Sequence, residues 1–407
     1  VLGHQTQLAI REIIAKHGYY YGRLRLGSYH NLRLMMDVAW DMERICPEAW
    51  LIQSGNPVFD GCTLMTRETN LKIIGLCHGH LGILDVCEKI GIDRDRVTWQ
   101  APGLNHNIWL THFLYDGEDA YPILDKWIST KGKEFWNDES ATSPPTPETD
   151  KTYVKAVNRR AWDIDLSRAA VNAYRMYGLL PIGDTVRRLG WWEHTDIDAK
   201  RYWFNRAWGG QDSHLGWPFY VKALDMRLTE MERLANDDKS DLLAAIGTGR
   251  PREQQVPIVD ALVNDKEGHF QVNVPNRAVL KGLPDDVVVE VPAVINKSGI
   301  HHYVKGDLPR NILLNAIYPD WLRMERVLHA FNSGDRAMLL WDILDDHQTR
   351  TYNQAMGVLE GIMKIREYED MAEHYKWSER WLLLKTWNDL CDQCGRWERK
   401  KCYFGWE

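Results

Sequence analysis

A thiol and three imidazoles stand in the sequence where a protein could hold a divalent transition metal. Cys77, His78 and His80 come directly after an apolar run, and His106 follows Cys77 by 29 residues. Thiolate sulfur and neutral imidazole both suit such a metal. Taken alone, Cys77 is more often a buried structural thiol, and His78 and His80 could be satisfied polar residues near a helix start. The elements that carry these residues therefore decide what they can do.

Two predicted strands place these side chains at one edge of a sheet. The run Leu71–Leu76 is apolar and rich in β-branched residues, which predicts a buried parallel strand, and Leu81–Ile90 predicts the helix after it. Upstream, Ala49–Ser54 predicts a second strand, and the Gly-Asn56-Pro57 that follows cannot continue a ladder. Since ligands bind at the carboxyl ends of strands in open α/β sheets, we expect one crevice here.

Two further polar segments could contribute to that crevice. Gly103-Leu-Asn105-His106 is a polar bend between predicted strands at 97–102 and 107–115. Asp184 lies beyond the end of a helix predicted at 161–177, with Arg187 three residues later. As chemistry, Asp184 is a carboxylate beside a cation. On local sequence alone an Asx-turn or helix N-cap is the better explanation.

The remaining pattern indicates a second, mixed region. Strands are predicted at 269–275 and 286–295, the latter ending near His301-His302, which could be metal ligands or supporting polar residues. From Pro309 to about Lys385 the pattern is helical. Ser140–Asp150 is typical of a solvated loop. Cys391, Cys394 and Cys402 lack a fourth ligand, which favours structural packing over a zinc site. Nineteen tryptophans could fill a core or an interface, or stack on sugars.

Composition excludes several classes of protein. The 407 residues are 44% hydrophobic and 26% charged, with a net charge of −7, and no long basic stripe occurs that would bind nucleic acid. No apolar run reaches the roughly 20 residues that span a bilayer. Seven scattered cysteines argue against a disulfide framework and for a reducing compartment. No Gly-x-Gly-x-x-Gly follows a predicted strand, so the chain shows no nucleotide-phosphate turn.

The linked motifs, rather than any one alone, resemble the family 4 glycoside hydrolases. Three of them are first-region motifs: Trp50 to Asn56-Pro57, Gly75-Leu-Cys77-His78-Gly79-His80, and Gly103-Leu-Asn105-His106. Three more resemble the family's second-domain signature: Val272-Asn273-Val-Pro-Asn, Leu283 to Pro292, and Gly299-Ile-His301. The resemblance covers roughly residues 1–375.

The resemblance implies an unusual hydrolysis, which departs from the two-carboxylate mechanism of most glycosidases. In this family the sugar is oxidised at C3 with NAD⁺, deprotonated at C2, cleaved by elimination, hydrated and reduced again. A divalent metal, expected to be Mn²⁺, acts as a Lewis acid on the sugar oxygens. By position, Cys77 and His106 resemble the metal ligands and Asp184 the C2 base. Asn56 resembles a residue that contacts sugar and cofactor, and His78 one beside the scissile oxygen.

The residues after Cys77 resemble the branch that cleaves uronides, the α-galacturonidases and α-glucuronidases. A C6 carboxylate needs cations, and Arg187, Arg188 and His80 are candidates, since Arg binds carboxylates in a bidentate manner. Asn105 is a further substrate-binding candidate. The function expected is therefore hydrolysis of an α-linked uronide, an α-galacturonide first. Alternatives are an α-galactosidase or α-glucosidase of the family, or a catalytically silent, truncated homologue that serves as a binding or assembly module.

The expected fold is α/β. Residues 1–95 would form the remainder of a Rossmann-like NAD-binding domain whose N-terminal part is missing. Residues 96–407 would form an α+β domain for substrate, metal and oligomerisation, with a long helical C-terminal part. A lactate or malate dehydrogenase shares the Rossmann ancestry, but the Cys77 and His106 pair and the long second region disfavour it. The resemblance also implies a homodimer or homotetramer in the cytoplasm.

Overall fold

The computed structural model describes most of the chain. The described residues are 4–19, 28–137, 164–204, 206, 209–210, 213, 216–239, 241–246, 253–379 and 381. The predicted loop Ser140–Asp150 and the predicted packing of Cys391, Cys394 and Cys402 lie outside these residues.

The two strands predicted to carry the site form a parallel pair. β1 (Trp50–Gln53) lies beside β2 (Lys72–Gly75), in register from Trp50 opposite Lys72 to Gln53 opposite Gly75. The crossover is α3 (Val58–Glu68), and α4 (Gly82–Ile90) follows β2 after a 3₁₀ turn, η2 (Gly79–Leu81). This βαβα arrangement confirms the predicted strand, strand and helix.

A mixed sheet continues from this parallel pair into the second region. β2 joins β9 (Gly268–Pro275), which runs antiparallel to β10 (Val288–Asn296). The order then passes through β4 (Gly103–Leu104), β5 (Asn107–Trp109) and β8 (Pro181–Ile182), while β11 (Gly299–His302) pairs with β10 off this path. The sheet thus crosses the predicted boundary at residue 95 without a break, and β9 and β10 link β2 to β4 and β5.

The strand predicted at 107–115 divides into two strands in different sheets. β5 stays in the large sheet, whereas β6 (His112–Tyr115) pairs with β3 (Val97–Gln100) and β7 (Glu118–Asp119) in a small one. The division occurs because the backbone N–H of Leu110 bonds to Leu180 and that of Thr111 to Gln100. β5 therefore ends at Trp109, and β6 begins at His112 in the other sheet.

Helices surround the sheets. The helix predicted at 161–177 begins only at Arg168, because Ser167 caps it by accepting the N–H of Ala170 at 3.2 Å. The helices and 3₁₀ turns outside the C-terminal part are α1 (His4–Lys16), α2 (Tyr29–Ile45), η3 (Arg94–Arg96), α5 (Tyr121–Thr130), α6 (Gly132–Asn137), α8 (Arg168–Tyr177), η5 (Gly183–Arg188), η6 (Trp191–His194), α9 (Ile197–Trp203), α10 (Gly216–Ala235), α11 (Leu242–Ile246) and α12 (Gln255–Asn264).

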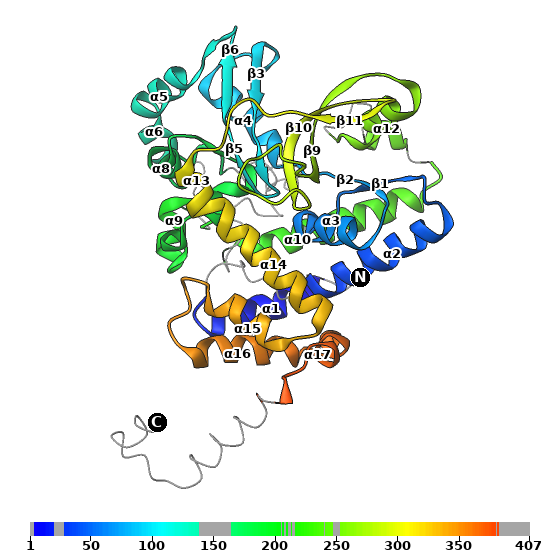
Figure 1. The fold of residues 1–407 in the computed structure, drawn as a ribbon. Helices are drawn as coiled ribbons and strands as arrows, with labels where there is room; N and C mark the ends of the chain where they lie inside the picture. Colours follow the sequence, from blue (N-terminus) through cyan, green and yellow to red (C-terminus); the bar gives the residue numbers. More distant parts are fainter. Residues whose placement is uncertain are drawn as a thin grey trace.

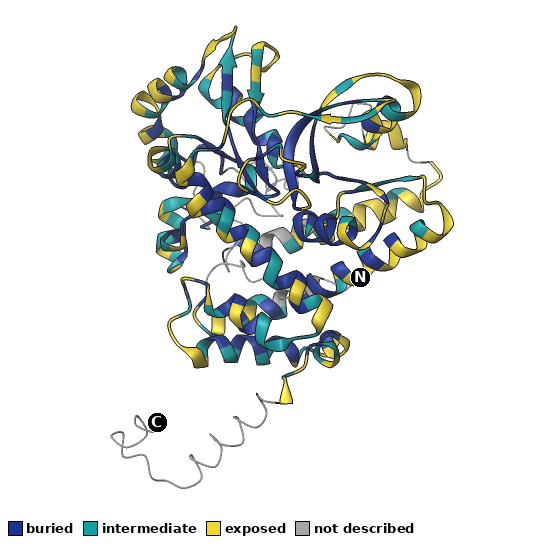
Figure 2. Cartoon of the chain, in the orientation of Figure 1, coloured by how far each residue is buried: buried dark blue, intermediate teal, exposed yellow. Residues whose placement is uncertain are grey.

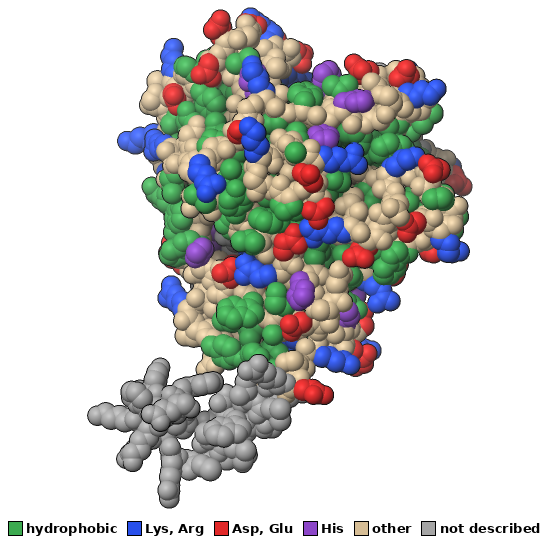
Figure 3. Space-filling view, viewed as in Figure 1, with side chains coloured by type: hydrophobic (Ala, Val, Ile, Leu, Met, Phe, Trp, Pro, Cys, Tyr) green, Lys and Arg blue, Asp and Glu red, His purple; other side chains and the backbone are tan. Residues whose placement is uncertain are grey.

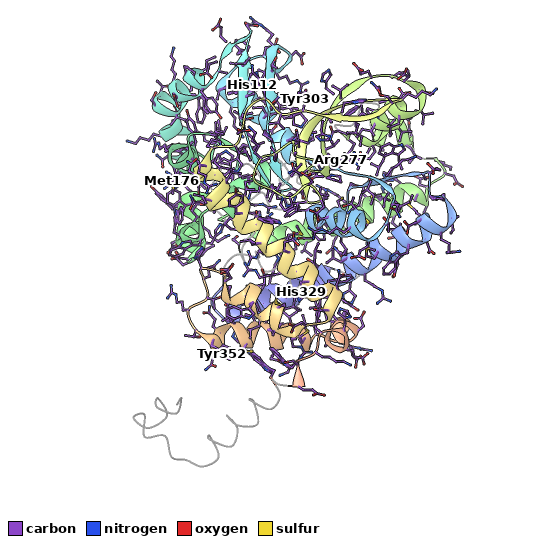
Figure 4. The ribbon with its side chains drawn as sticks, viewed as in Figure 1. His112, Met176, Arg277, Tyr303, His329 and Tyr352 are labelled. Atoms are coloured by element: carbon purple, nitrogen blue, oxygen red, sulfur yellow. The ribbon has the colours of Figure 1, made fainter. Side chains whose placement is uncertain are left out.

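The predicted helical C-terminal part is confirmed to His374. Its last helices lie at the end of the molecule opposite the small sheet of β3 and β6, where α1 packs against α16, whereas α14 runs from there along the main core and contacts α3 (Figure 1). Its elements are α13 (Arg310–Ile312), the π-helical η7 (Leu313–Ile317), α14 (Tyr318–Ser333), α15 (Arg336–Leu344), α16 (Tyr352–Met363), η8 (Arg366–Tyr368) and α17 (Glu369–His374). In Figure 4, His329 and Tyr352 lie at this end, and His112 lies at the other.

The core lies along the central strands. Figure 2 shows the middle of the large sheet in dark blue, and β10 is buried at all but two of its positions. On the face drawn in Figure 3, acidic and basic side chains are interspersed rather than gathered in one stripe. Within the described residues, no helix combines the length and apolar character needed to cross a membrane.

Candidate active site

A cavity of about 440 Å³ opens where β1 and β2 end. Parallel strands that stop together leave such a crevice at their carboxyl ends, as predicted here. Its described lining consists of Ser54, Asn56, Val58, Leu76, Cys77, His78, Gly79, Leu81, Gly82, Asp85, His106, Ile164, Asp165, Gly183 and Asp184.

Cys77 stands two residues beyond Gly75, the last residue of β2, at the wall of this cavity. The backbone N–H of Gly79 donates to its Sγ at 3.4 Å. Burial, together with the negative charges of Glu290 and Asp184, raises the pKa of the Cys77 thiol to about 12. The thiol is therefore neutral at physiological pH unless a cation lies beside it, because only a positive charge would offset two carboxylates and burial.

His106 reaches the cavity from a tight hairpin. Leu104 pairs with Asn107, so Asn105 and His106 are the two turn residues between β4 and β5. His106 has a φ of 62°, a left-handed conformation that such a turn requires and that is uncommon outside glycine. The hairpin turns the imidazole toward Asp184, whose Oδ2 lies 3.3 Å from Nε2.

Asp184 follows β8 in the η5 turn and is held by the guanidinium of Arg187. Arg187 Nη2 lies 2.8 Å from its Oδ1, and Arg187 Nε donates to the same oxygen at 3.0 Å. Burial alone would raise the pKa of Asp184, but Arg187, His106 and Arg188 together hold it well below its ordinary value. The carboxylate is thus ionised across the physiological range and ready to accept a proton.

Two more predicted residues border the cavity. Asn56, just after β1, lines it, and its backbone oxygen accepts from Asn31 Nδ2 at 2.6 Å. His78 also lines it but is two-thirds exposed, and its Nε2 lies 2.7 Å from a carboxylate oxygen of Glu253. The structure thereby brings Asn56, Cys77, His78 and the 106–184 pair to one cavity.

His80 and Asn105 are placed differently from the prediction. His80 is 6% exposed and stacks on Trp99 with ring centroids 6.1 Å apart, outside the set that lines the cavity. Burial lowers the pKa of His80 to about 4, so a cationic His80 that binds a substrate carboxylate is not what the geometry offers. Asn105 is 4% exposed and points to Glu290 rather than to open space, with Nδ2 donating to Oε2 at 2.9 Å.

Sequence reasoning missed three carboxylates. Asp85 and Asp165 line the cavity, and Asp165 Oδ1 accepts the N–H of Gly183 at 3.2 Å. Glu290 lies behind Cys77 in the middle of β10, and burial raises its pKa to about 7. Glu290 carried a signal, because it interrupts the apolar run Val287–Val291. For Asp85 and Asp165, the sequence has no feature that distinguishes them from aspartates on the surface.

The charge of this cavity differs from that of a second one. Its described lining includes Asp85, Asp165 and Asp184 and neither Lys nor Arg. The second cavity, about 400 Å³, lies by the opposite end of β2 and is lined by Lys72, Arg277 (labelled in Figure 4) and other residues, with no carboxylate among those described. The first cavity suits a cation and the second does not.

In the first cavity, protein atoms supply only some of the ligands that a divalent metal needs. Cys77 and His106 supply one sulfur and one nitrogen. Within the described ranges, no group of three or more His, Cys, Asp and Glu side chains is arranged to hold an ion. A metal here would complete its coordination with oxygens of substrate or water, as at an open catalytic site.

Comparison with known proteins adds the family. A model of the family 4 glycosyl hydrolases matches residues 12–92, and a model of the C-terminal domain of that family matches residues 101–349. The α-galactosidase of Bacillus subtilis is 24% identical over 70% of this chain, and the chain spans 59% of that relative's length. The α-galacturonidase of Thermoanaerobacter italicus is 22% identical over 84% of this chain and 73% of its own length.

Solved structures share the fold. A putative glucosidase from Bacillus subtilis superposes with a TM-score of 0.68 at 19% identity, covering 88% of this chain and 80% of that chain. A 6-phospho-α-glucosidase from gut microorganisms, solved with NAD and Mn²⁺, gives a TM-score of 0.62 at 17% identity over 90% and 79% of the two chains. Because the two family models together match well over half of the sequence, this chain belongs to glycosyl hydrolase family 4.

Proposed function

We propose that this protein hydrolyses an α-linked uronide, with an α-galacturonide as the first expectation, in a reaction that depends on NAD⁺ and a divalent metal. The observation that carries the proposal is the convergence of Cys77, His106 and Asp184 on one acidic cavity in a chain of family 4. NAD and Mn²⁺ are present in solved relatives of the same fold.

Cys77 and His106 would hold the metal, expected to be Mn²⁺. Bound there, the metal would act as a Lewis acid that polarises two sugar oxygens and makes the neighbouring C–H acidic. The adjacent carboxylates favour a cation at this place, which supports the assignment of the two residues.

Asp184 would be the base that takes the proton from C2 of the sugar. Arg187 and His106 keep the carboxylate ionised, so it is always free to accept a proton. The same contacts make it a weak base, and the reaction therefore needs a C–H that oxidation at C3 has already acidified. Arg187 acts through Asp184, because its guanidinium is engaged by that carboxylate.

Asn56 would contact sugar and cofactor together, since it stands at the end of β1 and lines the cavity. NAD⁺ would supply the acceptor for the hydride of sugar C3. The sequence has no Gly-x-Gly-x-x-Gly after a strand, so the described residues account for one wall of such a cofactor site and not for its pyrophosphate turn.

His78 would assist departure of the leaving group. It lies beside Cys77 at the open side of the cavity, and Glu253 orients its ring through Nε2. An imidazole at this position could pass a proton to the departing oxygen.

The uronide is supported by the Cys77–His80 motif and by α-galacturonidases among the relatives. A second candidate, a neutral α-glycoside, is favoured by the three carboxylates of the lining, which would repel an anionic sugar. α-Galactosidase and α-glucosidase relatives agree with this second candidate.

The test is hydrolysis of an aryl α-galacturonide and an aryl α-galactoside, each with and without NAD⁺ and with and without Mn²⁺. We expect turnover only with both additions, faster for the uronide, and without net NADH. Asp184→Asn should lose at least about 100-fold in rate while Mn²⁺ binding persists, since a general base contributes on the order of 10²–10⁴. Cys77→Ala should lose both turnover and Mn²⁺ binding.

Each other outcome selects an alternative. Equal or faster turnover of the galactoside would replace the uronide by the neutral sugar. Net accumulation of NADH from a hydroxy acid would indicate a dehydrogenase. Silence under all conditions, with no Mn²⁺ bound, would indicate a binding or assembly module.

We also propose a homodimer or homotetramer that works in the cytoplasm. α2 and α12 carry exposed apolar side chains that a subunit interface would cover, among them Leu34 at 65% and Val256 at 76% exposed. Dependence on NAD and the absence of disulfides among the described cysteines agree with a reducing compartment. Light scattering of the purified protein tests the oligomer.

A further inference from the structure

Glu290 is a buried carboxylate without a cationic partner. It lies in the middle of β10 and is 1% exposed. Among the described residues, no Lys, Arg or His forms an ion pair with it. A buried charge of this kind is costly unless something else at the site compensates it. Its position therefore calls for an explanation that packing alone does not supply.

The surroundings of Glu290 have too many hydrogen-bond acceptors. Asn105 Nδ2 donates to its Oε2 at 2.9 Å, and Asn273 Nδ2 approaches the same oxygen at 3.4 Å. Glu290 Oε1 has no donor, and neither do the buried amide oxygens of Gln271 and Asn273. Gln271, Asn273 and Glu290 lie on adjoining strands at alternate positions, so they share one face of the sheet.

This face connects directly to the two residues proposed as metal ligands. The side chain of Asn105 donates to Glu290 and lies close enough to Cys77 to lower the pKa of its thiol. His106 is the next residue in the same two-residue turn. Fixing the amide of Asn105 therefore fixes the position of the sulfur and the backbone that aims the imidazole.

We propose that Glu290 is a positioning residue that acts through Asn105 to hold Cys77 and His106 in the geometry that binds a divalent metal, and that its negative charge strengthens the binding. The inference rests on the proposed function, because it takes those two residues as the ligands. Outer partners of metal ligands typically contribute about 10- to 100-fold to metal affinity.

A structural role and a positioning role predict opposite results for Glu290→Gln. The variant keeps the size of the side chain and removes the charge. Its new amide N–H can donate to the unpaired oxygen of Gln271 or Asn273, so the metal-free protein should unfold at the same or a higher temperature. If Glu290 serves the metal site, Mn²⁺ affinity should fall about 10- to 100-fold at the same time.

The experiment is Mn²⁺ titration of the full chain, followed by electron paramagnetic resonance of the free ion, alongside thermal unfolding without metal. Glu193→Gln is the matched control, because Glu193 is also a carboxylate, 2% exposed, and does not line the cavity. We expect Glu290→Gln to bind Mn²⁺ at least about tenfold more weakly and Glu193→Gln to bind like the wild type.

A second variant covers the case in which Glu290→Gln fails to fold. Asn105→Ala removes the amide between Glu290 and Cys77 without adding a charge, and Glu290→Asp keeps the charge while it lengthens the gap to Asn105. Both should weaken Mn²⁺ binding. Alkylation of Cys77, mapped by mass spectrometry with and without Mn²⁺, gives a readout independent of turnover.

The possible failures are distinguishable. If the wild-type protein binds no Mn²⁺, the proposed function is wrong and this inference falls with it. If the wild type binds Mn²⁺ and Glu290→Gln binds it within threefold, only the inference about Glu290 is wrong. Lower thermal stability of Glu290→Gln with unchanged Mn²⁺ affinity would assign Glu290 a structural role instead.

Discussion

The Arg323 cluster and the surroundings of Glu290 are buried ionic clusters of opposite design. In the helical part, Arg323 of α14 is 7% exposed and lies 2.7 Å from Asp342 and 3.7 Å from Asp346. Next to it, Asp320 lies 3.5 Å from Arg188. Each carboxylate of this Arg323 cluster has a guanidinium within ion-pair distance. Glu290, beside Cys77, has none within the described residues.

We interpret the Arg323 cluster as one that stabilises the fold, and the Glu290 and Cys77 cluster as one that a bound cation would stabilise. Buried charges are tolerated when they are paired, and the Arg323 cluster meets this condition with protein groups alone. The Glu290 and Cys77 cluster meets it only when a cation is added. Unpaired buried carboxylates and raised thiol pKa values gather at functional sites, so this contrast supports our proposal that the Glu290 and Cys77 cluster is the functional one.

The two clusters are nonetheless connected. Asp320 accepts from Asn107 Nδ2 at 2.8 Å, and Asn107 directly follows His106. Arg188, which pairs with Asp320, belongs to the same η5 turn as Asp184. The connection to the segments that carry His106 and Asp184 thus runs through Asp320, whereas Arg323 itself pairs with Asp342 and Asp346.

The largest predicted effect breaks the paired cluster. Arg323→Met leaves Asp342 and Asp346 buried without a cation, and the free energy of unfolding should fall by about 3–5 kcal/mol. Chemical denaturation of the metal-free protein measures it. At denaturant concentrations where the variant is still folded, its Mn²⁺ affinity should stay near that of the wild type. A loss of Mn²⁺ binding in protein shown to be folded would mean that the two clusters do not serve separate tasks.

The next prediction uses pH to distinguish the clusters. Burial raises the pKa of Glu290 from 4.5 to about 7, so the folded protein binds its proton more tightly than the unfolded chain does. The stability that this group contributes is complete below about pH 4.5 and is lost as pH rises through about 7, by about 3 kcal/mol in all.

The measurement is the difference in unfolding free energy between wild type and Glu290→Gln, from pH 4.5 to 8 without metal. Relative to the variant, the wild type should lose stability as pH rises. His80, whose pKa is lowered to about 4, has the opposite slope but cancels in the difference. If this difference in unfolding free energy does not change with pH, burial in the folded protein does not disfavour the ionised form of Glu290.

Much of the fold was predictable from the sequence, because burial leaves a pattern. The parallel strands ending at Gln53 and Gly75 were found from apolar runs and the breakers after them. The hairpin at Asn105 and His106 was found as a polar bend between strands. The division of 107–115 was not, since backbone bonds to Leu180 and Gln100, distant in sequence, decide it.

The site was predictable only where strand ends determine it. Cys77 and Asn56 reach the cavity because each lies within three residues of the end of a parallel strand. Asp165 enters through tertiary contacts that no local pattern reports. Glu290 left a trace as one charge in an apolar strand, but its partner Asn105 is 185 residues away. Motif spacing shows which residues are near in sequence, and not which way their side chains point.

His80 illustrates that last limit and gives the smallest predicted effect. Its motif places it three residues from Cys77, yet the η2 turn directs the ring to Trp99 and away from the cavity lining. His80→Phe keeps an aromatic ring against Trp99 and removes the buried Nδ1, which has no hydrogen-bond partner. Stability should change by about 1 kcal/mol or less.

The KM for an aryl α-galacturonide should then stay within twofold in His80→Phe, and the ratio of uronide to galactoside turnover should not change. Steady-state kinetics on both substrates measures this. A rise of tenfold or more in KM for the uronide alone would restore His80 as the group that recognises the carboxylate. It would also mean that the acidic cavity gains its cation from a side chain rather than from a metal, which reverses the contrast between the two clusters.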